Sequence, residues 1–103
     1  MNRTLRQIWM SGKYHVQEAA RATDEAYYDV AKRLLRRFHA GLGPRLERLD
    51  ALPRDVGYEE AREVLTTIAI YRNTLRSTFP QGEALLSMSL EAVEEAIRMR
   101  FLH

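Results

Sequence analysis

Apolar and small residues recur at helical spacing along the first third of the chain, with no proline between them. The steps average about 3.67 residues, close to the period of an α-helix. The series consists of Leu5, Ile8, Gly12, Val16, Ala19, Thr23, Tyr27, Val30, Leu34 and Phe38. This pattern predicts one long N-terminal helix whose apolar stripe must be covered by later segments.

A helix-start signal lies inside this run. Thr23, Asp24 and Glu25 offer a capping residue followed by acids in the first turn, which is typical of a helix N-terminus. Two collinear helices with a break near Thr23 are therefore the alternative to one helix. Because no glycine or proline is present to make a tight turn, we expect continuity or a mild kink rather than a hairpin.

Gly12 is a second weak point, since glycine inside a helix costs about 1 kcal/mol relative to alanine. Either another backbone approaches the stripe closely at Gly12, or residues 1–11 form a separate docking arm that hinges there. Trp9 and Tyr14 lie near this point. Aromatic residues at helical spacing are more typical of ordinary core than of a docking arm.

Punctuating residues divide the rest of the chain. The run Gly41-Leu42-Gly43-Pro44 predicts the end of the long helix, with Pro44 in the first turn of a short helix over residues 44–52. Residues 53–57 then form a loop, and Thr78-Phe79-Pro80-Gln81-Gly82 forms another break.

Two further helices of about 20 residues are predicted from stripes at steps of three and four. The first stripe is Ala61, Val64, Ile68, Tyr71, Leu75 and Phe79, and the second is Leu86, Leu90, Val93, Ile97 and Phe101. No alternating strand pattern is present in the sequence. We therefore predict an all-α fold: residues 1–103 form a single irregular helical bundle with a long first helix, one short helix and two of about 20 residues.

Composition indicates an ordinary globular protein, with 46% hydrophobic and 29% charged residues among 103. The chain has no cysteine, which removes disulfides and thiolate zinc sites and fits a reducing compartment. No apolar run approaches the roughly 18 residues that cross a bilayer, and no signal-peptide pattern follows Met1. We expect a cytoplasmic protein without a membrane partner.

Catalytic and metal-binding patterns are missing from the sequence. His15 precedes Glu18 by three residues, the reverse of the Glu-x-x-His order that helical di-metal sites use. No serine lies in a Gly-x-Ser-x-Gly turn, and no glycine loop cradles a phosphate. We expect a non-enzymatic protein without a cofactor or a metal.

Basic residues concentrate in the first half of the chain, which carries ten lysines or arginines and five acids over residues 1–48. Six of them form a candidate anion-binding set that we call the basic ridge: Lys32, Arg33, Arg36, Arg37, Arg45 and Arg48. Pairs four residues apart lie on one side of a helix, so such a ridge can follow a phosphate backbone without reading its sequence. The alternative is a solvated helix face whose cations serve the helix dipole.

A long helix with shorter partners leaves one end uncovered, and the sequence places that end at the N-terminus. The candidate interface residues there are Leu5, Ile8, Trp9 and Tyr14. A bare apolar end is typical of a contact with a partner. Under this hypothesis, Trp9→Ala abolishes association and leaves helicity intact.

Two functions follow. The first is a small assembly or adaptor subunit that binds itself or a larger protein. One form of this hypothesis places the subunit within a nucleoprotein complex. The alternative is a binder of the RNA or DNA backbone that uses the basic ridge. Part of the chain resembles the N-terminal half of small helical subunits of CRISPR RNA-guided effector complexes, at Gln7, Trp9, Tyr14, Val16, Tyr27, Ala31, Leu34 and Gly41-Leu42. The resemblance spans about 42 residues, has Leu35 where that pattern has proline, and assigns no family.

Overall fold

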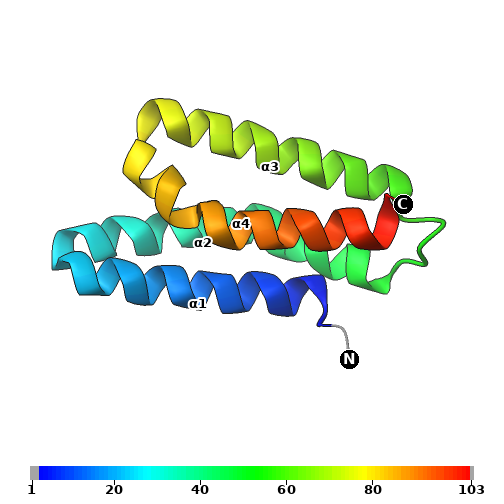
Figure 1. The fold of residues 1–103 in the computed structure, drawn as a ribbon, viewed down its shortest axis with the longest axis horizontal. Helices are drawn as coiled ribbons and strands as arrows, with labels where there is room; N and C mark the ends of the chain where they lie inside the picture. Colours follow the sequence, from blue (N-terminus) through cyan, green and yellow to red (C-terminus); the bar gives the residue numbers. More distant parts are fainter. Residues whose placement is uncertain (1–2, 103) are drawn as a thin grey trace.

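A computed structural model describes residues 3–102, apart from the side chain of Met88. Within that range the chain forms four helices and no strand, which confirms the all-α prediction. The helices are α1 (Leu5–Thr23), α2 (Glu25–Ala51), α3 (Tyr58–Thr78) and α4 (Pro80–Phe101). They run up and down in turn, as Figure 1 shows, in a body of 44 × 30 × 20 Å.

The predicted continuity of the first helix is wrong, because α1 and α2 form an antiparallel hairpin. Asp24 alone separates them, with an extended backbone at φ −168° and ψ 166°. Its side chain accepts a hydrogen bond from the Tyr27 backbone N–H at 2.7 Å, so the N-cap is Asp24, one residue after the Thr23 that the sequence suggested. One extended residue with a capping carboxylate reverses the chain here without glycine.

The predicted stop at residues 41–44 is also wrong, since α2 continues through Pro44 to Ala51. Pro44 is exposed, and the leucines on either side of it, Leu42 and Leu46, are buried and remain in phase. A proline inside a helix costs about 3 kcal/mol, and burying one leucine side chain returns about 2 kcal/mol. Burial along the far side of α2 therefore outweighs the proline, and the predicted short helix over residues 44–52 belongs to α2.

The last two helices match their predictions closely. α3 begins after Gly57, and the break expected at residues 78–82 is reduced to Phe79. Pro80 occupies the first turn of α4, where a proline has no hydrogen bond to lose. The Phe79 ring packs on the backbone of Gly82, where a carbon added to the glycine would lie 2.4 Å from Phe79 Cδ2.

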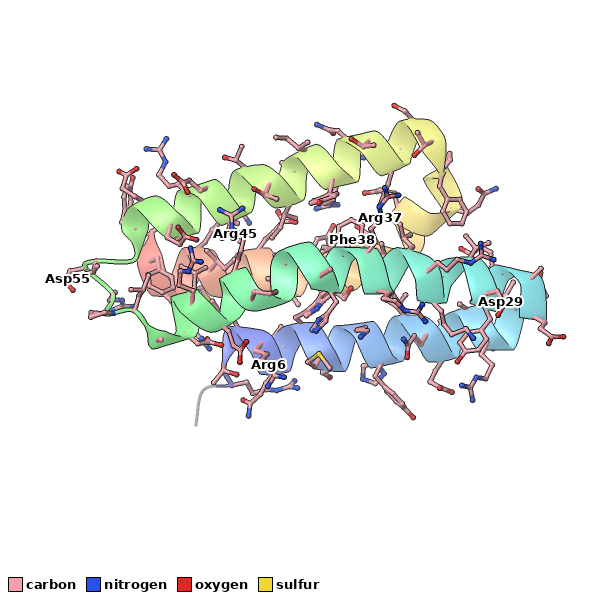
Figure 2. All side chains as sticks on the ribbon, turned by 180° about the vertical axis from the view of Figure 1, so that it is seen from behind. Arg6, Asp29, Arg37, Phe38, Arg45 and Asp55 are labelled. Carbon is pink, nitrogen blue, oxygen red and sulfur yellow. The ribbon has the colours of Figure 1, made fainter. Side chains whose placement is uncertain are left out.

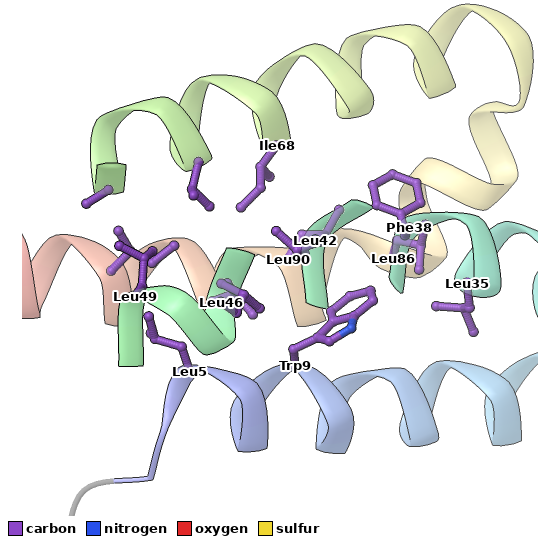
Figure 3. Close-up of a cluster of buried hydrophobic side chains, with 14 of the residues drawn as sticks. Leu5, Trp9, Leu35, Phe38, Leu42, Leu46, Leu49, Ile68, Leu86 and Leu90 are labelled. Carbon is purple, nitrogen blue, oxygen red and sulfur yellow. The ribbon is translucent and has the colours of Figure 1, made fainter. Parts of the chain in front are cut away.

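One hydrophobic cluster joins all four helices (Figure 3). Trp9 lies at its centre between α1 and the leucines of α2 and α4, and it is fully buried. The other fully enclosed side chains include Leu5, Leu35, Leu46, Leu49, Val64, Ile68, Leu86, Leu90, Val93 and Ile97. Each fully buried side chain of this kind contributes roughly 1.5–3 kcal/mol.

The four helices do not pack equally. α4 packs closely on α1 and on α3, whereas α2 and α3 diverge and make few contacts (Figure 1). At the closest approach of α1 and α4, a carbon added to Gly12 would lie 2.3 Å from Ser89 Cβ and 3.2 Å from Ser89 Cα. Of the two explanations for Gly12, the close backbone approach is correct.

Candidate interaction surfaces

The apolar end predicted at the N-terminus is present as a surface only in part, because two of its four residues are buried. Leu5 and Trp9 are fully buried, and Ile8 is partly buried against the core. The hairpin of α1 and α2 encloses Leu5 and Trp9 in the core, whereas Ile8, Gly12 and Ala19 of the predicted stripe line an open groove. Tyr14 is the one predicted interface residue that is exposed, at 60%.

The first turn of α1 is tied down rather than free to act as an arm. Asp50 of α2 accepts hydrogen bonds from the backbone N–H groups of Leu5 at 2.7 Å and Arg6 at 3.1 Å. Arg100 of α4 donates to the same carboxylate at 3.2 Å. A carboxylate at a helix N-terminus satisfies orphan donors and complements the helix dipole. Residues 5–11 therefore belong to the packed body of α1, contrary to the docking-arm alternative.

An open apolar groove of about 530 Å³ runs between α1 and α4. We call it the α1/α4 groove. Its floor and walls are mostly small or apolar residues: Ile8, Ser11, Gly12, Val16 and Ala19 of α1, with Ala84, Leu85, Ser89 and Ala92 of α4. The α4 residues were missed by the sequence analysis. Their signal was the alanines and Leu85 outside the main stripe, which make α4 apolar on more than one face.

Polar groups border the α1/α4 groove at defined places. Arg3 and His15 are its charged or titratable lining residues. The Tyr14 ring stands edge-on to His15, with ring centroids 5.8 Å apart. Glu95 is exposed on α4, beyond Ala92. The surface therefore combines an apolar hollow, a basic lining residue and a neighbouring exposed aromatic ring.

The basic ridge is divided by its ion pairs. All six residues lie on α2, and three of them have partners within the protein. Arg45 approaches Glu60 at 3.7 Å and Glu63 at 3.6 Å, and Arg48 approaches Glu60 at 3.6 Å. These contacts link α2 to α3.

Lys32 is the third partnered residue of the ridge. Its ammonium group lies 3.4 Å from Asp29 and 4.5 Å from the centre of the Tyr28 ring. The ion pair is exposed, so it contributes little to stability. It does neutralise Lys32 locally, which leaves three arginines to consider.

Arg33, Arg36 and Arg37 form what we call the arginine cluster. All three are exposed, and within residues 3–102 none of them makes an ion pair. Figure 2 shows Arg37 on the side of α2 that faces α3, next to Phe38. Because α2 continues to Ala51, these arginines are not in a last helical turn, and the helix-dipole explanation for them is wrong.

Two titratable groups inside the fold have shifted pKa values. Burial, aided by the charges of Lys13 and Arg6, lowers the pKa of His39, whose Nδ1 accepts a hydrogen bond from Trp9 Nε1 at 3.0 Å. Burial opposes the charge of Arg72, yet its hydrogen bonds to Glu94 and Glu83 outweigh this and raise its pKa. These groups hold helices together, and neither lies in a pocket that we identify.

The comparisons with known proteins found nothing: no family model, no curated protein and no solved structure matches this chain. No cluster of metal-binding side chains occurs among the residues that the structure describes. Over the same residues, no helix has the length and apolar character needed to cross a membrane. Two surfaces of the protein remain as candidate binding sites: the α1/α4 groove and the arginine cluster.

Proposed function

We propose that the protein is a non-enzymatic assembly subunit that associates with a second copy of itself through the α1/α4 groove. The groove is the observation that carries the proposal. It is open to solvent, and small side chains on both helices leave room for another helix to approach. An apolar hollow of this kind is typical of a binding surface.

A second copy is the occupant that this face fits best. The same two helices supply the apolar hollow and exposed side chains able to fill one, such as Tyr14 and Met99. The basic lining residue Arg3 and the exposed acid Glu95 give the face complementary charges. A two-fold pair requires one surface to complement itself in this way.

Sedimentation equilibrium tests this proposal. We expect the wild-type protein to sediment as a dimer, and Ala92→Glu to sediment as a monomer because it places a charge in the groove. Ala69→Glu is the matched control, since Ala69 is equally an exposed helical alanine but lies on α3. A wild-type monomer at all concentrations, or a dimeric Ala92→Glu variant, would overturn the proposal.

We infer as a second candidate that the arginine cluster binds the phosphate backbone of a nucleic acid. The specific observation is that Lys32, Arg45 and Arg48 have partners, whereas Arg33, Arg36 and Arg37 have none within residues 3–102. Three unneutralised guanidinium groups within about one helical turn attract polyanions. This function uses the face of α2, so it is compatible with dimerisation through α1 and α4.

The salt dependence of oligonucleotide binding tests the second candidate. The triple variant Arg33/Arg36/Arg37→Ala should weaken binding equally across sequences and reduce the salt slope by about two to three. The charge-matched control is Arg62/Arg76/Arg98→Ala, which removes the same charge from exposed positions on α3 and α4. Equal loss in both triple variants would contradict a site at the cluster.

A further inference from the structure

A small pocket adjoins the arginine cluster where α2 meets the corner between α3 and α4. We call it the corner pocket. Its volume is about 250 Å³, and it is lined by Val30, Arg33, Leu34, Arg37 and Phe79. It exists because α2 and α3 diverge, which leaves the apolar side chains of α2 and the corner partly uncovered.

The aromatic wall of this pocket is held in place. The Phe79 ring packs on the backbone of Gly82, and the Tyr27 ring stands edge-on to it with centroids 6.1 Å apart. Tyr27 in turn donates a hydrogen bond from its hydroxyl to the Gln81 carbonyl at 3.1 Å. Ring packing therefore holds the aromatic wall of the pocket in position, and the Tyr27 hydrogen bond ties α2 to the corner.

Two chemistries meet at the corner pocket. Val30, Leu34 and Phe79 provide an apolar and aromatic interior. Arg33 and Arg37 stand at the same pocket, and Arg36 lies in the same turn of α2. A ligand that suits this arrangement has a flat apolar part for the interior and more than one negative charge outside it.

We propose that the corner pocket receives an unstacked base of a single-stranded nucleic acid while the arginine cluster holds the adjoining phosphates. This inference rests on the second candidate function and specifies its ligand. A base contributes a flat π face to an aromatic or apolar wall, and its flanking phosphates supply successive charges. A duplex keeps its bases stacked inside, so it can engage the arginines but not the pocket.

Fluorescence anisotropy with two labelled strands tests this inference on the full chain. One strand is a short oligothymidylate, and the other has the same length and phosphates but abasic residues. We expect the oligothymidylate to bind about tenfold more tightly, as base stacking on a protein side chain provides. Val30→Phe fills the pocket and should bring this ratio close to one. Val56→Phe, which adds the same ring at an exposed loop position, should leave the ratio of the two affinities unchanged.

The possible outcomes distinguish base binding in the corner pocket from backbone binding by the arginine cluster. Equal binding of the two wild-type strands, lost in Arg33/Arg36/Arg37→Ala, keeps the backbone function and overturns the corner pocket. A base preference that persists in Val30→Phe also overturns the pocket. If neither strand binds, the backbone function itself is wrong, and the inference falls with it.

Discussion

The α1–α4 and α2–α3 contacts are built in opposite ways. α1 and α4 approach so closely that Gly12 has no room for a side chain beside Ser89. α2 and α3 diverge and are joined by longer side chains. The tilted rings of Phe38 and Tyr71 have their centroids 4.7 Å apart, and Arg45 forms ion pairs across the gap. Small residues thus allow the backbones of α1 and α4 to approach closely, and large or charged residues keep α2 and α3 further apart.

This difference assigns different chemistry to the two sides of the bundle. Small apolar residues on α1 and α4 leave an apolar groove beside their contact. On the other side, the divergence of α2 and α3 exposes arginines that lack carboxylate partners within the described residues, together with the corner pocket. We propose a protein partner for the first side and a polyanion for the second.

The largest loss in the free energy of unfolding is expected from Trp9→Ala, which removes a large side chain from the centre of the hydrophobic core. Trp9 is fully buried, and such truncations cost about 3–5 kcal/mol. Urea unfolding followed by circular dichroism measures the loss. A folded variant of wild-type stability would show that Trp9 is not central to the core.

The next largest change in the free energy of unfolding is expected at two glycines, Gly12 and Gly41, which both lie inside helices. Gly12→Ala should destabilise by about 2 kcal/mol because its methyl group must displace Ser89. Gly41→Ala should stabilise α2 by about 0.5–1 kcal/mol, since the added carbon meets only the Tyr71 hydroxyl at 3.4 Å. Urea midpoints measure both changes. Shifts of the same sign would contradict the contrast between the two contacts.

A smaller effect is expected where charges join α2 to α3. Arg45 also donates a hydrogen bond to Thr67 at 2.8 Å, but its side chain is partly exposed. Arg45→Met should therefore cost about 1 kcal/mol, because solvent screens such pairs and Arg48 still approaches Glu60. Thermal unfolding measures the cost. A loss of stability comparable to that of Trp9→Ala would mean that the Arg45 contacts with α3 stabilise the bundle as much as the core does.

The last prediction concerns His39, which must be neutral to accept the Trp9 hydrogen bond. Its pKa in the fold lies below the ordinary value of 6.5, so the unfolded chain binds the proton more readily. The free energy of unfolding should fall as the pH drops below 6.5 and level off below the folded-state pKa. Urea unfolding between pH 5 and 8 measures this, and His39→Gln should flatten the curve. His15→Gln, at an exposed position, should not.

The helical periodicity allowed α3, α4 and most buried positions to be predicted, because burial and spacing agree there. It could not reveal the hairpin at Asp24. α1 and α2 both turn an apolar face toward one core, so helical spacing continues across the break as if the helix did too. The buried residues of α2 are Ala31 and Leu35, whereas Val30 of the predicted stripe is exposed. The capping pattern at Asp24 was the correct signal, and the lack of a glycine was not evidence against a turn.

The candidate surfaces were harder to predict, since both depend on how the helices sit together. The exposure expected at Trp9 followed from the wrong hairpin rather than from the residue itself. The sequence shows six cations near one another on the chain, and anion binding by this basic ridge stays a prediction. Only the fold shows that Glu60 and Glu63 of α3 form ion pairs with Arg45. It also shows that Arg37 makes no such pair within the described residues.

Amide NMR spectra recorded over a dilution series test the central claim most directly, namely that the α1/α4 face is where this protein associates. The account predicts concentration-dependent shifts at residues 8–19 and 84–96. It predicts constant positions for the amides of Arg33, Arg36 and Arg37. Shifts centred on α2 and α3, or a spectrum that does not change on dilution, would contradict it.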